Sequence, residues 1–307
     1  MEKEKIVIVG LGWIGQANAI ALLNLDYEVF YFDPAEPPHH YRAYEQSYVQ
    51  LKRISDPRAE DSDHTVYIVC VGDKVAEDGV QDISRVHAAL EALKGVKGTV
   101  VLRSTIIPDK LSGLSFDFYL PEFMHEKTAV EECLWPYLFV LGAKVKKDEP
   151  TFFVEWRKRA HKRFEGTPAE SAHIKYIWNL WNATRIAFVN EFGNTIALPT
   201  SPENLRAVER VMDFLFDRRI YMKYGRSFGG DCLPKDTRAY VRWYKDKGLD
   251  MSLFAGVYSA NEAHKLVEKK YPILPEWYSK FPERYVSAKV ALQSLWHTFL
   301  KYVTLTY

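Results

Sequence analysis

The chain has 307 residues, a formal net charge of +1 and a hydrophobic content of 47%. This length predicts two domains, and the apolar content excludes a disordered chain. The near-zero net charge gives no reason to expect a nucleic-acid or membrane-surface partner, and the longest apolar runs are too short to cross a membrane. Three cysteines without a CxxC pair predict free thiols in a reducing compartment, the cytoplasm, and the nine histidines show no metal-site spacing.

The first half of the chain alternates short buried strands with helical segments. Helices are expected at 14–25 and 83–93, and strands at 5–9, 27–33, 65–71, 98–104 and 137–142. Strands that alternate with helices are typical of a parallel sheet covered on both faces. We therefore predict an α/β domain of the Rossmann type over residues 1–168.

The second half has a different pattern. One long helix is expected at 170–198, and helical periodicity continues to about residue 270. Residues 169–270 are therefore predicted to form a mostly α-helical central domain. Residues 269–285 contain three prolines and lead into an amphipathic stretch at 284–302, so we interpret 271–307 as a linker and a helical tail.

A glycine motif follows the first predicted strand. Gly10, Gly12 and Gly15 separate that strand from a helix, and Asp33 ends the next strand. In this context the glycines allow a tight turn, a close approach of the backbone to a pyrophosphate, and close packing of helix on strand. Asp33 would bind a ribose 2′-hydroxyl and repel a 2′-phosphate, which favours NAD over NADP. The alternative is an ordinary strand–helix turn that happens to hold three glycines.

A cysteine lies in a polar loop of sequence SFGGDCLPKD. Gly229 and Gly230 can bring the backbone close to a ligand, and a cation such as Lys235 favours the thiolate form of Cys232, which is the nucleophile. Asp236 suits a base. In a chain that binds NAD, a nucleophilic cysteine suggests oxidation of an aldehyde through a thioester. The alternative is a bystander in a surface loop, and the other two cysteines, at 70 and 133, are expected to be structural.

These residues carry a resemblance to a known family. GGDCLPKD resembles the active-site signature of the UDP-glucose/GDP-mannose dehydrogenase family. Further segments between residues 4 and 264 resemble family motifs in the same order, namely EDGVQDIS, STIIPDK, PEFMHE, IKYIWNLWNATRIAFVNE and DRRI.

The resemblance implies a reaction. It implies oxidation of the C6 alcohol of a nucleotide sugar to a carboxylate with two NAD, by a homodimer joined through its central domain. The likeness is greatest to the members that act on UDP-glucose, because CLPKD keeps the lysine and the IKY helix matches them best. GDP-mannose as the substrate and a non-catalytic NAD- or nucleotide-sugar-binding protein remain alternatives.

The resemblance also implies residue roles. Cys232 attacks the aldehyde, Lys175 and Asn179 stabilise the oxyanion, and Asp236 activates water. Glu122 promotes thioester hydrolysis, supported by Thr105. Further substrate positions are Phe123, Glu126, Arg219, Phe228, Gly229 and Gly230, and further cofactor positions are Trp13, Ile14, Val71, Ser104, Thr105 and Lys235.

Plainer interpretations exist for several of these positions. Lys175 and Asn179 could form a solvated helix face, and Glu122 and Glu126 could be surface carboxylates. The remaining two alternatives are a strand end for Thr105 and a surface ion pair for Arg219 with Asp217.

The chain departs from the family pattern at three places. Asp73-Lys74 replaces a Thr-Pro pair near the cofactor, and Lys127 with the Pro136-Tyr137-Leu138 segment alters the region expected to cover the substrate. Where members carry a further α/β domain, only the tail at 271–307 is expected. We therefore expect the nucleotide to be held differently, weakly or by a partner. The tail helix is expected to cover the substrate cleft or the dimer seam, and the alternative is a helix that packs back on its own domain.

Overall fold

The computed structural model describes residues 3–144, 147–216, 221–230, 232–250, 252–273 and 275. The chain divides into two compact units, the first made of Met1–Ala76 with Gln81–Lys175 and the second of Glu77–Val80 with Tyr176–Tyr307. The DRRI segment at 217–220, which contains Asp217 and Arg219, and the tail helix at 284–302 lie outside the described residues.

An eight-stranded sheet forms the centre of the first unit, in the order β10-β9-β8-β7-β4-β1-β2-β3. Its strands are β1 (Lys5–Val9), β2 (Glu28–Phe32), β3 (Lys52–Arg53), β4 (Thr65–Val69), β7 (Thr99–Leu102), β8 (Phe118–Tyr119), β9 (Leu138–Ala143) and β10 (Lys162–Gly166). All neighbours pair in parallel except β8 and β9. A separate antiparallel ribbon joins β5 (Lys74–Val75) and β6 (Gln81–Asp82). The predicted α/β fold is confirmed, with one antiparallel pairing that the periodicity did not indicate.

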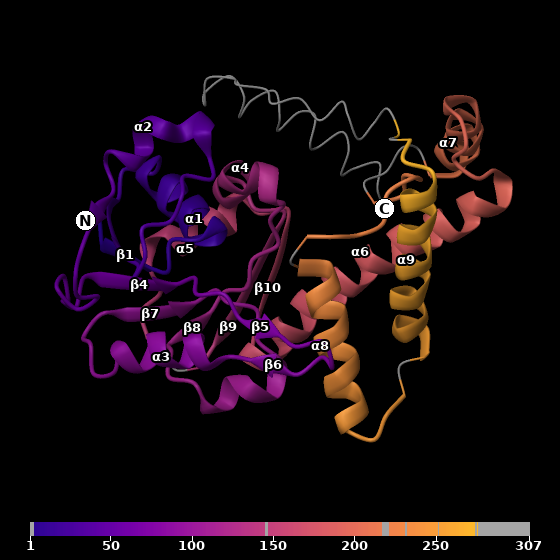
Figure 1. Cartoon of the computed structure of the whole chain (residues 1–307). Coiled ribbons are helices and arrows are strands. Elements are labelled where there is room, and N and C mark those ends of the chain that lie inside the picture. Colours follow the sequence, from indigo (N-terminus) through magenta and orange to yellow (C-terminus); the bar gives the residue numbers. More distant parts are fainter. Residues whose placement is uncertain are drawn as a thin grey trace. The chain divides into compact units, whose positions relative to one another are not determined.

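Helices cover both faces of this sheet, which explains why central strands such as β4 and β7 are buried along their whole length. Val7 and Val9 of β1 pack in one core cluster with Val86 and Leu90 of α3 (Ser84–Ala92). On the other face, Ile8 lies against the start of α1 (Trp13–Leu23). Figure 1 shows α1 and α3 on opposite sides of the strands. The remaining helices of this unit are η1 (Arg42–Tyr44), α2 (Glu45–Tyr48), η2 (Pro108–Gly113), η3 (Glu126–Thr128), α4 (Ala129–Leu134) and α5 (Thr151–Arg159).

The order of the strands places the ligand-binding edge. The chain passes from β1 to β2 and β3 on one side, and to β4, β7 and β8 on the other, so the order reverses at β1. In open α/β sheets, ligands bind at the carboxyl ends of the strands next to such a reversal. The loops after β1, β2, β4 and β7 are therefore the candidate binding region.

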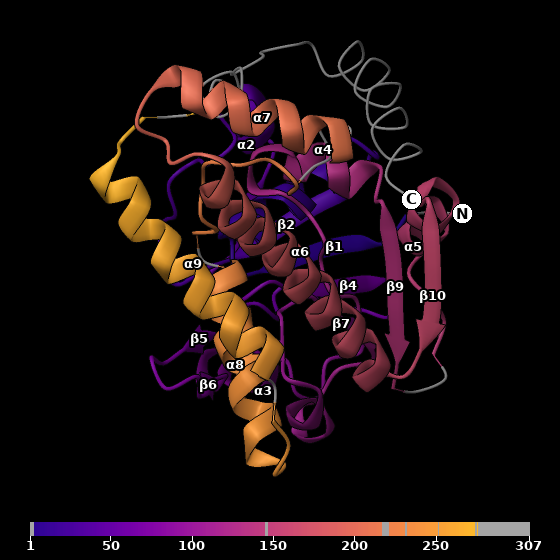
Figure 2. The ribbon, with the colours of Figure 1, turned by 90° about the vertical axis from the view of Figure 1, so that its right-hand side faces the viewer.

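Four helices account for most of the described part of the second unit. They are α6 (Pro168–Ile196), which begins in the first unit, and α7 (Pro202–Phe216), α8 (Cys232–Asp246) and α9 (Ser252–Lys270). Ala183 and Ala187 of α6 pack with Val257 of α9, while Val189 packs with Val208 of α7. Figure 2 shows α7 and α9 alongside α6. Among the described residues, no helix is long and apolar enough to span a bilayer.

The start of α6 has a local cause. Thr167 accepts a hydrogen bond from the Glu170 amide (3.2 Å), and the Glu170 carboxylate accepts one from the Thr167 amide (2.7 Å). Pro168 lies inside this reciprocal capping box, directly after Thr167, and its fixed φ suits a first helical position. The helix thus begins two residues before the predicted start, because capping rather than apolar spacing sets its boundary.

Candidate active site

The three glycines of the motif are required for three different reasons. Gly10 has a φ of +89°, which favours glycine, and a Cβ on Gly15 would lie 2.0 Å from the Gly10 carbonyl oxygen. Gly12 has an ordinary φ of −71°, and a Cβ there would meet nothing within 4 Å. Since neither conformation nor packing requires a glycine at 12, the open space beside it is room for a group outside the chain.

The adjoining end of α1 suits an anion. Gly12 is the N-cap, no side chain caps the helix, and no acidic residue lies in its first turn. The first amide N–H groups and the positive end of the helix dipole are thus left for an external acceptor. Together with the space at Gly12, these features fit the pyrophosphate of a dinucleotide.

Asp33 follows β2 and faces the glycine motif. Its carboxylate accepts hydrogen bonds from the amides of Leu11 (2.7 Å) and Ala35 (2.9 Å). A carboxylate has about four acceptor sites, so these two bonds leave capacity for ribose hydroxyls. The residue therefore fits the predicted role and also fastens the loop that holds Gly12.

The other predicted cofactor positions of the first unit lie at the same edge of the sheet. Val71 and Ser104 follow β4 and β7, and the Ser104 hydroxyl donates to the Val71 carbonyl (2.6 Å). The Trp13 indole is partly exposed and stacks on His40, with ring centroids 4.0 Å apart. Ile14, in the first turn of α1, is half-buried. The stack with His40 was not predicted, because no local spacing links residues 13 and 40.

Gln81 organises this edge and was not singled out from the sequence. Its buried side chain donates to Asp73 (2.7 Å) and to the Thr105 carbonyl (3.0 Å), and it accepts from the Ile107 amide (3.0 Å). Asp73, where members of the resembled family carry threonine, thus contacts the segment of Thr105 through Gln81. Gln81 lies in the EDGVQDIS segment, which resembles a family motif, so this resemblance could have pointed to Gln81 as a site residue.

Lys175 and Glu122 form a buried ion pair. The ammonium donates to the carboxylate at 2.8 Å, and the two residues are only 3% and 6% exposed. Burial opposes ionisation of Glu122, but the Lys175 charge and its hydrogen bond outweigh burial and hold the pKa of Glu122 below its ordinary value. Neither a solvated helix face nor a surface carboxylate describes these two residues.

A second pair lies one helical turn along α6. The Asn179 amide donates to the Asp236 carboxylate at 2.6 Å, and both residues are buried. The other oxygen of that carboxylate lies 2.8 Å from the Lys235 ammonium. An amide that donates to a carboxylate holds both groups in one orientation, so Asn179 and Asp236 form a fixed polar pair.

Cys232 is the first residue of α8, one turn before Asp236, and its side chain is exposed. The negative charge of a thiolate is favoured at a helix N-terminus. A Cβ on Gly229 or Gly230 would meet nothing within 4 Å, and Gly230 has a φ of +67°. The cysteine therefore begins a helix instead of lying within a loop, and open space precedes it.

The remaining predicted site residues differ in burial. Phe123 is half-buried and lies beneath the Lys175 ammonium, 5.5 Å from ring centroid to nitrogen. Phe228 is buried, Thr105 is half-buried and Glu126 is exposed. Cys133 is buried as expected, whereas Cys70 is only half-buried, and burial raises the pKa of each of these thiols to about 12. Within the described part of the chain, no His, Cys, Asp or Glu cluster could hold a metal ion.

The sequence matches a family model over its central part. Residues 169–263 match the central domain of the UDP-glucose/GDP-mannose dehydrogenase family. The dehydrogenases of this family use NAD, which confirms the cofactor expected from the glycine motif.

Individual members are moderately similar to the chain. GDP-mannose 6-dehydrogenase of Pseudomonas aeruginosa is 28% identical over 292 residues, and UDP-glucose 6-dehydrogenase TuaD of Bacillus subtilis is 28% identical over 302 residues. These alignments cover 80% and 86% of the chain but 65% and 64% of the relatives, so the chain spans less than two thirds of their length.

The fold is similar to those of solved family members. A UDP-glucose dehydrogenase from Pyrobaculum islandicum superposes with a TM-score of 0.73 at 24% identity, covering 89% of this chain and 72% of that protein. A UDP-D-ManNAc dehydrogenase from Pyrococcus horikoshii superposes with a TM-score of 0.66 at 20% identity, covering 87% and 70%.

Proposed function

We propose that the protein is an NAD-dependent nucleotide-sugar 6-dehydrogenase that oxidises a primary alcohol to a carboxylate through a thioester on Cys232. The observation that carries the proposal is an exposed thiol at the start of α8, one turn before an aspartate that is itself held by Asn179. A nucleotide-binding protein without catalysis has no use for a thiol and a fixed carboxylate on adjacent turns.

The first unit would hold the cofactor. Gly12 and the uncapped start of α1 would bind the pyrophosphate, and Asp33 would accept from the ribose hydroxyls. When bound, NAD accepts the hydride that leaves C6 in each of the two oxidations. The same carboxylate would repel a 2′-phosphate, so NAD is proposed over NADP.

The residues of the chain would act on the sugar carbon in sequence. The Cys232 thiolate adds to the aldehyde produced by the first oxidation, and the oxyanion of this thiohemiacetal accepts hydrogen bonds from Lys175 and Asn179. Loss of a second hydride from that carbon gives the thioester. Water, deprotonated with the help of Asp236 or Glu122, then cleaves the thioester and releases the carboxylate and the thiolate. One alcohol and one water thus consume two NAD.

UDP-glucose is the leading substrate, because CLPKD retains Lys235 and the α6 segment is most like members that act on that sugar. GDP-mannose is the second candidate, since a relative with that printed activity is as similar to this chain. We further propose a homodimer that associates through α6. Three cysteines without a CxxC pair favour a reducing compartment, the cytoplasm.

The test is NADH production by the full chain with a panel of UDP-glucose, GDP-mannose and UDP-N-acetylmannosamine, with NAD or NADP. We expect two NADH per molecule of one sugar, and little reaction with NADP. Cys232→Ser should lower the rate by about a thousandfold or more, because a serine hydroxyl is poorly activated at neutral pH. Cys133→Ser is the matched control and should keep activity. Binding of NAD without oxidation of any sugar would refute the proposed activity.

A further inference from the structure

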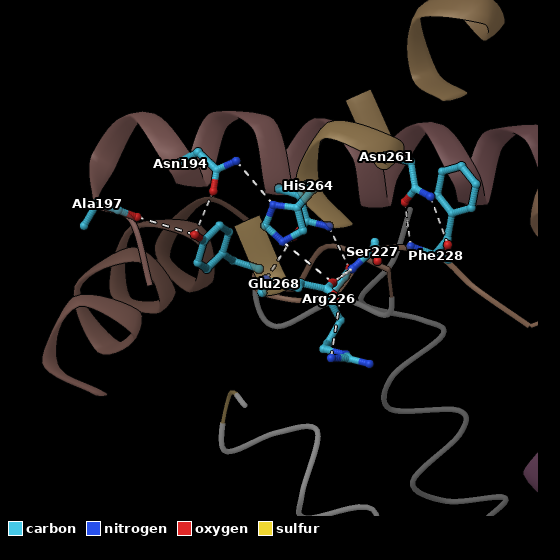
Figure 3. Close-up of polar contacts among 11 residues, drawn as sticks. Asn194, Ala197, Arg226, Ser227, Phe228, Asn261, His264 and Glu268 are labelled. Carbon is cyan, nitrogen blue, oxygen red and sulfur yellow. Dashed lines mark hydrogen bonds and ion pairs between the residues drawn. The ribbon is translucent and has the colours of Figure 1, made fainter. Parts of the chain in front are cut away.

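The backbone shortly before Cys232 is hydrogen-bonded to side chains of two helices. Between Gly225 and Phe228, three amide N–H groups and two carbonyl oxygens pair with side chains of α6 and α9. Figure 3 shows these contacts on the α9 side of the segment. Backbone groups that lack partners in a buried segment are costly, so these side chains decide which conformation the segment adopts.

Asn190 of α6 holds the first part of the segment. Its amide oxygen accepts from the Gly225 N–H (2.9 Å) and its amide nitrogen donates to the Arg226 carbonyl (2.7 Å). Next to it, the Tyr224 ring lies against Gly193, and the Tyr224 hydroxyl donates to Asn194 (2.9 Å). Gly225 has a φ of +107°, a conformation that an L side chain rarely adopts.

Asn261 of α9 holds the second part in the same way. Its amide oxygen accepts from the Phe228 N–H (2.7 Å), and its amide nitrogen donates to the Phe228 carbonyl (3.0 Å). Asn261 is completely buried, and Phe228 is 3% exposed. One buried asparagine side chain therefore pairs with both backbone polar groups of Phe228, as a neighbouring strand would. These two hydrogen bonds fix the position and the orientation of the Phe228 backbone.

Glu268 completes the anchor between these two asparagines. Its carboxylate accepts from the Ser227 N–H and lies 3.4 Å from the Arg226 guanidinium. On α9, Asn261, His264 and Glu268 follow each other at spacings of three and four residues, so they occupy one face of the helix. His264 lies between them and contacts Asn194 (3.3 Å).

The cysteine follows this anchored segment closely in the chain. Beside Gly229 and Gly230 there is open space, and two residues later Cys232 begins α8. We propose that Asn190 and Asn261 are positioning residues for the Cys232 reaction, because they fix the backbone from which the cysteine segment departs. This inference rests on the proposed function for its catalytic part, whereas the anchoring itself can be measured without any activity.

The experiment compares Asn261→Leu, which removes both hydrogen bonds at similar volume, with Asn261→Asp, which keeps the acceptor for the Phe228 N–H. Asn204→Ala is the matched control, because it also removes two hydrogen bonds, to Leu198 and Thr200, but none to the segment. Hydrogen exchange of the peptide covering 221–230 reports the anchoring. The kcat with the nucleotide sugar that is oxidised fastest and the Kd for NAD show whether the loss of anchoring affects catalysis or cofactor binding.

In Asn261→Leu we expect exchange in this peptide to become about tenfold faster. We also expect kcat to fall at least tenfold while the Kd for NAD is unchanged, since NAD is assigned to the first unit. Asn261→Asp should recover part of kcat. Asn204→Ala should change neither the exchange rate of this peptide nor kcat.

Unchanged exchange in 221–230 would overturn the anchoring. Faster exchange with unchanged kcat would overturn the positioning role. If no sugar is oxidised by the wild type, the alkylation rate of Cys232 replaces kcat, and a rate that is the same in Asn261→Leu and in the wild type would overturn the role. Should Asn261→Leu fail to fold, the same comparisons apply to Asn261→Asp, with smaller changes.

Discussion

Lys175 and Glu122 show how burial changes the chemistry of two ordinary side chains. An isolated carboxylate in this position would lose its charge, because burial penalises the ionised form. The ammonium 2.8 Å away reverses that outcome and keeps the pKa of Glu122 below its ordinary value of 4.5. The pair therefore holds a carboxylate that is ionised at neutral pH, as the role proposed for Glu122 in thioester hydrolysis requires.

The pH dependence of stability should reveal this pair. Because the pKa of folded Glu122 is depressed below its ordinary value of 4.5, its stabilisation is fully present above about pH 4.5 and is lost as pH falls through the folded value. Lys175→Met leaves burial as the main influence, so the pKa of Glu122 rises. We expect a loss of about 3–5 kcal/mol in the free energy of unfolding at pH 7, which shrinks as the pH is lowered and the carboxyl takes up a proton. Urea denaturation at several pH values measures both effects.

A surface pair supplies the control. Lys5 and Glu60 lie at nearly the same distance, 2.7 Å, with side chains 46% and 25% exposed. Lys5→Met should cost less than about 1 kcal/mol at any pH, because water screens an exposed pair. Equal losses in the two variants would show that burial does not distinguish the pairs.

Two glycines within helices, one in a crowded place and one beside open space, allow the effect of helix propensity on stability to be distinguished from the effect of packing. Gly193 lies in α6, where a Cβ would come 2.1 Å from a ring carbon of Tyr224. Gly256 lies in α9, where a Cβ would meet nothing within 4 Å. Intrinsic propensity favours alanine over glycine in both helices, so any difference between the two substitutions comes from tertiary contact.

We expect Gly256→Ala to raise the free energy of unfolding by about 0.5–1 kcal/mol, from helix propensity alone. Gly193→Ala should lower it by about 1–3 kcal/mol, because the Tyr224 ring must move and its packing is lost. Thermal or urea unfolding of the two variants is the measurement. Stabilisation by Gly193→Ala would show that the Tyr224 ring does not need the space at 193.

For the whole molecule, the exposed face of α6 bears on assembly. Its large apolar side chains at positions 177, 181, 188 and 192 differ by 4, 7 and 4 residues, so they form one stripe. Trp181 is 54% exposed and Phe188 is 44% exposed. Such a contiguous apolar stripe on a monomer is unusual, and burial against the same stripe of a second copy would remove it from water.

The proposed homodimer can be tested by light scattering. Trp181→Glu places a charge in the stripe and should shift the mass of the assembly towards that of one chain, because an unpaired buried carboxylate opposes association. Phe214→Glu is the control, since this side chain is 85% exposed on α7 and lies outside the stripe. If both variants keep the wild-type mass, the copies do not associate through this stripe.

Short-range sequence patterns were sufficient to predict the fold of the first unit and the reactive cysteine. The glycine spacing, the acidic residue after the second strand and the cysteine before a Lys-Asp pair each depend on a few neighbouring residues, so they predict the dinucleotide fold and a reactive thiol. The course of α6 followed from apolar spacing, and its start at Pro168 from a capping box that the sequence also contains. Short elements such as β8, with two residues, have too little periodicity to be detected.

Only the tertiary structure decided which side chains meet. Glu122 and Lys175 are separated by 53 residues, and Asn179 and Asp236 by 57 residues. Helical periodicity shows that Lys175 and Asn179 share a face, but it does not show which distant carboxylate that face reaches or that water is excluded there. The same holds for Asn190 and Asn261, which hold the backbone before Cys232. Burial and partner choice are properties of the folded backbone path, whereas turns, caps and spacing are properties of adjacent residues.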